Sequence, residues 1–299
     1  MITDAHFPAK LLLFGEYTVL KGSQALAMPL TQFGGTWQYS DDLKKQYDLP
    51  KLAQYIKKLV ENGQIRLDTE GVEKALAEGL YFHSDIPRGY GVGSSGALVA
   101  ALYDKFGMDK TLTINELKTI LGLIESCFHG SSSGIDPLVS YIKKTILIKP
   151  DKNLMILDNA FNPPSNDFQV FLLDTHIRRK TEPLVRFFLE KCTLKNEYNT
   201  LITNELVPLI DEAIHLYINN NCDALLSIIN QISGFQYKYF PEMIPLPFKN
   251  LWLEGLSSTA YTLKLCGAGG GGFILGFCRN IEKATQEIAK SGFSIKAIS

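Results

Sequence analysis

The chain of 299 residues lacks an excess of charge of either sign, a paired cysteine motif and a long apolar run near its start. Its 30 basic and 31 acidic residues give a formal net charge of −1, which does not favour a nucleic-acid or membrane-surface partner. The five cysteines form no CxxC pair, so we expect free thiols in a reducing compartment. The apolar run 11–14 is too short for a signal peptide or a membrane span, and we therefore expect a cytoplasmic protein.

The pattern of strands and helices predicts an α+β fold with mixed sheets. Apolar residues recur at helical spacing over 49–62, and Thr113 and Glu116 have the spacing of a capping box at the start of a helix. Segments of both types are interspersed in both halves of the chain. The segment 159–167 contains two prolines and three asparagines without periodicity, which is typical of a linker. We expect two domains, 1–160 and 161–299. The remaining expected strands are 10–14, 25–30, 35–39, 79–86, 145–149, 154–158, 168–175, the strand–turn–strand 262–277 and 293–298, and the remaining expected helices are 96–106, 183–237 with breaks and 281–292.

Three glycine-rich stretches match patterns that occur in unrelated enzymes. The pattern G-x-G-x-x-G occurs at 91–96 and at 267–272, but the first runs from helix to helix and the second into a strand, which is not the dinucleotide-binding context. The segment 130–134, GSSSG, matches the nucleophile elbow of hydrolases, with His176 or His215 as a base, but an expected helix rather than a strand precedes it. No P-loop lysine follows any of them.

The stretch PRGYGVGSSGAL, residues 87–98, nevertheless has the chemistry of an anion site. Its glycines permit close backbone approach, and two serines lie where the next helix begins. The free N–H groups and the positive dipole end of that helix favour an anion, and a serine hydroxyl can be an oxygen ligand for Mg²⁺. Taken alone, the stretch leaves a tight turn before a core helix as an equal alternative.

Three segments in order resemble the motifs of the GHMP kinases, the family named for galactokinase, homoserine kinase, mevalonate kinase and phosphomevalonate kinase. They are PAKLLLFGEYTVLKG at 8–22, the stretch 87–98, and KLCGAGGGGFILG at 264–276. The resemblance implies a ribosomal-protein-S5-like ATP-binding domain, a ferredoxin-like second domain, and phosphorylation of a small alcohol with ATP and Mg²⁺. The segment ESCFHGSSSGIDP at 125–137 resembles the members that act on mevalonate. Gly96, Tyr17 and Pro137 depart from the common pattern, where alanine, histidine and asparagine stand.

The resemblance also implies roles for individual residues. Asp136 would accept or orient the proton of the alcohol, and Lys10 beside it would polarise the attacked hydroxyl. Ser95 and Glu125 would bind Mg²⁺. ATP would be held by Gly89, Gly91, Gly93, Ser94, Ser95 and Gly96, and the substrate by Glu16, Tyr17, His129, Thr181 and Gly269.

Several alternatives remain open at this point. His129 could cap its loop instead, and the cations at 178–180 could bind an anionic group of the substrate. We expect a small molecule and ATP as partners, no nucleic acid and no membrane, and leave a homodimer open. Mevalonate is the expected acceptor. The alternatives are phosphomevalonate, another small alcohol, or a non-catalytic ATP-binding role for the same fold.

Overall fold

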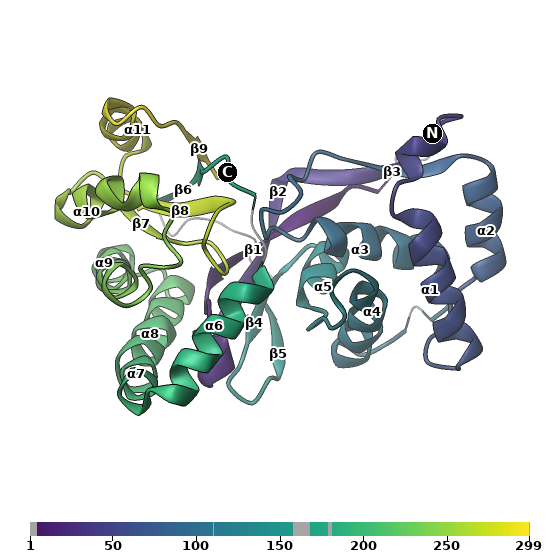
Figure 1. Ribbon diagram of the computed structural model, residues 1–299, viewed down its shortest axis with the longest axis horizontal. Coiled ribbons are helices and arrows are strands. Elements are labelled where there is room, and N and C mark those ends of the chain that lie inside the picture. Colours follow the sequence, from purple (N-terminus) through teal and green to yellow (C-terminus); the bar gives the residue numbers. More distant parts are fainter. Residues whose placement is uncertain (1–4, 110, 158–167, 179–180, 299) are drawn as a thin grey trace. The chain divides into compact units, whose positions relative to one another are not determined.

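The computed structural model describes residues 5–109, 111–157, 168–178 and 181–298, which form two compact units (Figure 1). The first unit comprises the chain up to Lys10, residues 28–87 and residues 92–144. The second comprises residues 11–27, 88–91 and 145–299. The predicted domain boundary at residue 160 falls outside the described residues and stays a prediction.

The first unit is built around a buried helix. α3 (Ser94–Phe106) is buried from Gly96 to Tyr103, because this part of its sequence is almost wholly apolar. α4 (Ile114–His129) and α5 (Ile135–Ile142) pack against it, and α4 begins with the predicted capping box (Figure 1). α5 was not among the helices expected from the sequence, and it begins at residue 135, directly after the segment 130–134. The other elements are α1 (Leu49–Glu61), which contacts α4, α2 (Thr69–Ala77), β3 (Leu80–Ser84) and a 3-10 turn at Leu43–Gln46.

Two long strands, β1 (Phe7–Phe14) and β2 (Ala25–Tyr39), contribute residues to both units. In the first unit, residues 35–39 of β2 pair antiparallel with β3. The prediction of two separate strands, 25–30 and 35–39, is wrong, because β2 continues through residues 31–34. A Cβ on Gly34 would lie 2.2 Å from the ring of His6, and one on Gly35 2.4 Å from the ring of Phe82. These glycines therefore permit close packing on the strand rather than ending it.

The second unit contains an antiparallel sheet in the order β7-β8-β6-β9. α9 (Cys222–Tyr239) and α10 (Lys249–Ser257) pack on β7. Residues 25–27 of β2 pair with β4, and β4 pairs with β5. The strands are β4 (Thr145–Ile148), β5 (Leu154–Leu157), β6 (Gln169–Asp174), β7 (Thr262–Leu265), β8 (Phe273–Cys278) and β9 (Ile295–Ala297). The remaining helices are α6 (Thr181–Leu194), α7 (Asn196–Leu201), a π-helical turn (Ile202–Leu206), α8 (Val207–Ile218) and α11 (Ile281–Lys290), with 3-10 turns at Thr18–Lys21 and Leu246–Phe248.

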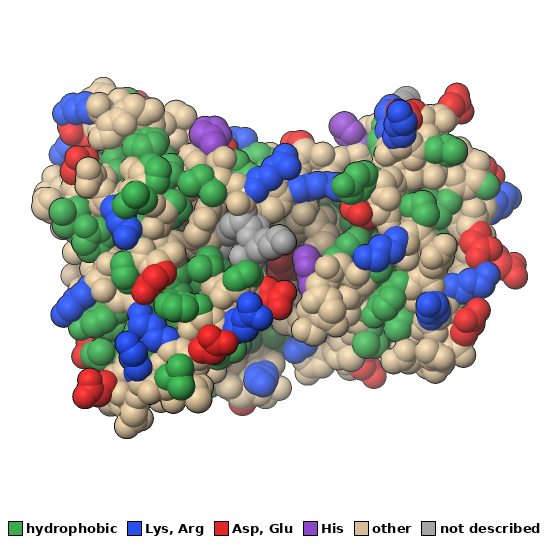
Figure 2. Space-filling view, viewed as in Figure 1, with side chains coloured by type: hydrophobic (Ala, Val, Ile, Leu, Met, Phe, Trp, Pro, Cys, Tyr) green, Lys and Arg blue, Asp and Glu red, His purple; other side chains and the backbone are tan. Residues whose placement is uncertain are grey.

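The distribution of charged side chains, the state of the cysteines and the hydropathy of the helices are consistent with the composition of the chain. Acidic and basic side chains are interspersed over the face drawn in Figure 2, as expected for a formal net charge of −1. The five cysteines are free thiols. Of the helices in the described ranges, none is long and apolar enough to span a membrane.

Gly96 and Gly234 form a matched pair of helical glycines for testing the packing of α3. A Cβ on Gly96 would lie 2.8 Å from backbone atoms of Asp136 and Pro137, which no rotamer change can move away. We expect Gly96→Ala to lower the free energy of unfolding by about 1–3 kcal/mol through overpacking. For Gly234, in α9, the nearest atom is 3.9 Å away, so Gly234→Ala should raise it by about 0.5–1 kcal/mol. Urea denaturation of both variants tests the pair, and equal shifts in one direction would contradict it.

Candidate functional site

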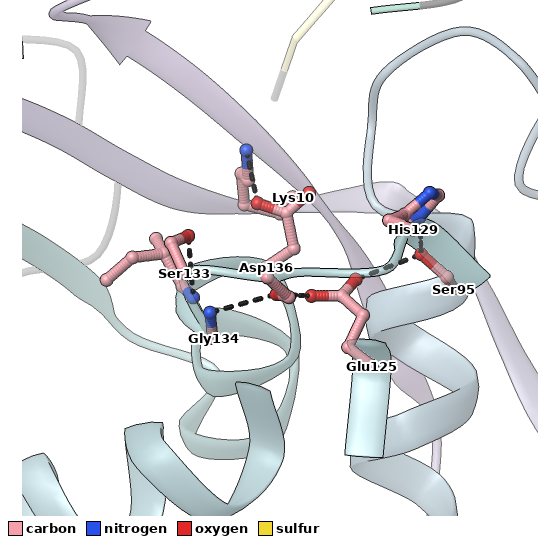
Figure 3. Close-up of polar contacts among 9 residues, drawn as sticks. Lys10, Ser95, Glu125, His129, Ser133, Gly134 and Asp136 are labelled. Carbon is pink, nitrogen blue, oxygen red and sulfur yellow. Dashed lines mark hydrogen bonds and ion pairs between the residues drawn. The ribbon is translucent and has the colours of Figure 1, made fainter. Parts of the chain in front are cut away.

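Lys10 and Asp136 lie together in the first unit, as the sequence predicts (Figure 3). The backbone N–H of Lys10, on β1, donates to the carbonyl of Val92 in the glycine-rich stretch at 2.8 Å. Its Nζ is 2.6 Å from Oδ1 of Asp136, and the residue is only 8% exposed. Asp136 lies in the first turn of α5, where the helix dipole favours a carboxylate. The pair therefore offers an oriented carboxylate beside a fixed cation.

The start of α3 is left open by its capping residue. Gly93 is the N-cap, with φ of 77°, and it has no side chain to accept the N–H groups of the first turn. Its backbone lies beside the ion pair, since a Cβ there would be 3.4 Å from Cβ of Lys10 and 3.5 Å from Asp136. Ser94 and Ser95 follow in that first turn. An anion placed here would receive N–H donors and the positive end of the helix dipole.

Glu125 and Ser95 form the second part of the cluster (Figure 3). The hydroxyl of Ser95 donates to Oε1 of Glu125 at 2.9 Å and lies 3.1 Å from Nε2 of His129. The hydroxyl of Ser132 donates to the other carboxylate oxygen, Oε2, at 2.5 Å and accepts the N–H of Gly134 at 3.0 Å. Glu125 thus has both carboxylate oxygens engaged by hydroxyl groups.

The electrostatics of Glu125 are unfavourable to its charged form. The residue is 3% exposed, and burial, followed by the negative charge of Asp136, raises the pKa of its carboxyl group to about 7. The hydrogen bonds from Ser132 and Ser95 and the charge of Lys10 oppose this rise in the pKa. A cation bound at the carboxylate would offset both the burial and the repulsion.

The residues present fit a magnesium ion. Mg²⁺ prefers octahedral oxygen ligands at 2.0–2.1 Å, which places neighbouring ligand oxygens about 2.9 Å apart. The Ser95 and Glu125 oxygens have this spacing of 2.9 Å. In the described ranges, no three His, Cys, Asp or Glu side chains gather in a way that could hold a metal. Water and phosphate oxygens would therefore complete the shell.

Glu16, which the resemblance assigns to the substrate, is buried in the second unit. Its Oε1 is 2.5 Å from Nζ of Lys264, and the side chains of the pair are 1% and 0% exposed. Burial raises the pKa of Glu16, and the Lys264 charge opposes this. Sequence reasoning missed Lys264. The available signal was a single lysine between two leucines, Leu263 and Leu265, in an expected strand.

Tyr17 and Gly269 also lie within the second unit. The Tyr17 hydroxyl donates to the carbonyl of Ala268 at 2.5 Å, and its ring packs on Phe188 and Phe240. Gly269 has φ of 69°, and a Cβ on it would lie 2.4 Å from a backbone oxygen. The glycines of the third motif thus serve packing inside this unit. Whether they and Tyr17 also contact a substrate stays a prediction.

The glycine-rich stretch is divided between the units, because Gly89 and Gly91 belong to the second. Between them, the hydroxyl of Tyr90 donates to Asp174 at 2.9 Å. Thr181 is the first residue of α6, but its side chain lies outside the described residues, as do Arg179 and Lys180. The cluster is defined as the predicted site residues that belong to the first unit: Lys10, Gly93, Ser94, Ser95, Gly96, Glu125, His129 and Asp136.

Comparison with known proteins finds a likeness to the same family that the motifs resemble. Residues 52–144 match the model of the GHMP kinases N terminal domain. A mevalonate kinase of Thermococcus sibiricus is 31% identical over 166 residues, which are 46% of this chain and 49% of that protein, so the match spans about half of the relative. A mevalonate kinase of Pyrococcus horikoshii is 24% identical over 94% of this chain and 90% of its own length.

Solved structures share the fold. The structure of L. major mevalonate kinase in complex with R-mevalonate has a TM-score of 0.66 at 16% identity, covering 97% of this chain and 91% of its own. That of Streptococcus pneumoniae phosphomevalonate kinase with phosphomevalonate and AMPPNP has a TM-score of 0.66 at 14% identity, covering 99% and 100%. At these identities the likeness is one of fold. The domain match and the curated relatives confirm the resemblance to the GHMP kinases, and the solved structures confirm the α+β fold.

The raised pKa of Glu125 predicts how stability depends on pH without divalent cations. Between the ordinary value of 4.5 and about 7, the folded protein holds a proton that the unfolded chain releases, so stability falls as the pH rises. Between pH 5 and pH 8 the resulting loss in the free energy of unfolding should be about 2–3 kcal/mol. Glu125→Gln should remove this loss, as measured by urea denaturation in EDTA at pH 5 and pH 8.

The control is Glu116→Gln, which removes an exposed capping carboxylate whose pKa is lowered by its hydrogen bonds with Thr113. The stabilisation from Glu116 is lost only as the pH falls below the ordinary carboxyl pKa of 4.5. Between pH 5 and pH 8 the free energy of unfolding of the Glu116→Gln protein should therefore change with pH as that of the parent does. If the Glu125→Gln protein also follows the parent, the carboxyl group is not the source of the pH dependence.

Proposed function

We propose that this chain, whose residues 52–144 match the model of the GHMP kinases N terminal domain, is an ATP-dependent kinase that phosphorylates the primary alcohol of mevalonate. The products would be phosphomevalonate and ADP. The observation that carries the proposal is one cluster holding the Lys10–Asp136 ion pair, the open start of α3 and the Ser95–Glu125 pair. Phosphoryl transfer depends mainly on positioning and charge stabilisation, and this cluster offers both.

Each part of the cluster has a role in this reaction. Asp136 would orient the substrate hydroxyl and accept its proton, and Lys10 would stabilise the negative charge that develops on the attacking oxygen. The N–H groups at the start of α3 would hold phosphate oxygens. Ser95 and Glu125 would hold Mg²⁺, which supplies positive charge to the phosphates when bound.

The choice of mevalonate rests on sequence rather than on fold. The support is the segment 125–137 and the two archaeal relatives named mevalonate kinase. The fold alone is neutral, since a phosphomevalonate kinase matches it equally well. Phosphomevalonate is therefore the second candidate, and a non-catalytic ATP-binding protein the third. A cytoplasmic location and a homodimer stay predictions.

Asp136→Asn tests the catalytic assignment. The amide cannot accept the alcohol proton, so we expect kcat to fall at least a hundredfold, about 2.7 kcal/mol of barrier, while ATP still binds. A coupled assay gives kcat, and calorimetry gives the affinity for ATP. Asp41→Asn, an exposed change outside the cluster, is the control. A loss of less than tenfold would make Asp136 a bystander.

A substrate panel tests the acceptor. The ratio kcat/KM should be compared for mevalonate, phosphomevalonate, galactose and homoserine under one set of conditions, because specificity is the ratio of these values. We expect mevalonate to be preferred at least about a hundredfold, near 2.7 kcal/mol. Faster turnover of another acceptor would replace mevalonate and keep the kinase. Binding of ATP without turnover of any acceptor would favour the non-catalytic protein.

A further inference from the structure

The hydroxyl of Ser95 has one proton and two acceptors within reach (Figure 3). Oε1 of Glu125 lies at 2.9 Å and Nε2 of His129 at 3.1 Å. A hydroxyl donates one full hydrogen bond, so only one of these acceptors can receive it at a time. Among the described residues, these are the two acceptors that Ser95 can choose between.

Occupation of the site by a divalent cation decides between the two acceptors. If Ser95 and Glu125 both turn oxygen lone pairs to one cation, the proton cannot stay between their oxygens, because the cation repels it and occupies the lone pairs. The hydroxyl must then donate elsewhere. Ser132 already donates to Oε2 of Glu125 and accepts the N–H of Gly134. Among the described residues, His129 is the other acceptor within reach of the Ser95 hydroxyl.

The helix that carries Glu125 also fixes His129. The two residues are four apart on α4, so their side chains lie on one face, one turn apart. His129 is the last residue of the helix, which ends at Gly130 with φ of 72° and an N–H donated to Ser126 at 2.9 Å. His129 is exposed, so its Nδ1 can carry the ring proton in contact with water. This tautomer leaves Nε2 free to accept.

We propose that His129 is a positioning residue for the metal. Its Nε2 accepts a hydrogen bond from the Ser95 hydroxyl group, and this leaves the lone pairs of the Ser95 oxygen free for the cation. The proposal rests on the proposed kinase function and deepens it. Partners that orient the direct ligands of a metal typically contribute 10–100-fold to its affinity. The role differs from the direct substrate contact that the sequence suggests for His129.

The first experiment reads the histidine itself. The chain has five histidines, so ring nitrogen signals in a long-range ¹H–¹⁵N spectrum at pH 8 can be assigned with His129→Gln as the reference. We expect Nε2 of His129 to be the unprotonated nitrogen. Its signal should move in the direction of a stronger hydrogen bond when Mg²⁺ and a non-hydrolysable ATP analogue are added. A protonated Nε2, or a signal that Mg²⁺ leaves unchanged, overturns the proposal. The signal is measured on the parent protein, and the His129→Gln variant serves only to assign it.

The second experiment measures affinity for Mn²⁺ by electron paramagnetic resonance in the presence of the same analogue. His129→Leu removes the acceptor and should weaken Mn²⁺ binding at least tenfold. His129→Gln offers an amide oxygen and should recover most of the affinity, whereas His83→Leu, an exposed change elsewhere, should have no effect.

The outcomes separate this proposal from the proposed function. If Glu125→Gln abolishes Mn²⁺ binding and His129→Leu does not weaken it, the role of His129 is wrong and the metal site stands. If His129→Leu changes only the KM for mevalonate, His129 is a substrate contact and the proposal is wrong. If neither variant alters Mn²⁺ binding, the metal site itself is wrong, and the proposed function loses its support with it.

Discussion

The close approach of α3 and α5 is the constraint on which the cluster depends. At Gly96, no side chain separates the first turn of α3 from the backbone of Asp136 and Pro137. This contact places the start of α3, with Ser95, next to the start of α5, with Asp136. A larger residue would push apart the two helix ends that hold the hydroxyl and the carboxylate. The close approach of the two helices also explains why glycine stands at position 96, where the family commonly has alanine.

The chain buries two carboxylates, Glu16 and Glu125, with different partners, and the difference indicates which of them can bind a cation. Glu16 has a lysine, Lys264, as a buried partner, so its charge is already balanced within the second unit. The hydroxyl groups of Ser95 and Ser132 donate to the two oxygens of Glu125, and burial and the like charge of Asp136 raise its pKa more than the charge of Lys10 lowers it. A buried charge that is not balanced by a paired counter-charge is costly unless a ligand supplies one. This imbalance is why Glu125, and not Glu16, is the candidate for a cation.

Local sequence patterns predicted α1, α3 and α4, because apolar periodicity and the Thr113–Glu116 capping box act within a few residues, but they missed α2 and α5. They failed at β2, where glycines that usually end strands serve instead to admit neighbouring rings. The placing of Lys10 beside Asp136 came from the resemblance to a family and not from any local signal. Ser132 and Lys264 were missed for the same reason. The partner of Lys264 lies 248 residues away in the chain, where no local pattern can reveal it.

The partition of the chain has a consequence for how such a protein can change over generations. The sequence passes from one unit to the other at residues 10–11, 27–28, 87–88, 91–92 and 144–145. No single crossover between two related genes could therefore exchange one whole unit and leave the other intact. Recombination at a point between residues 11 and 144 would produce a hybrid in which both units mix residues from two parents. A crossover at residue 91 would also divide the glycine-rich stretch between the two parents.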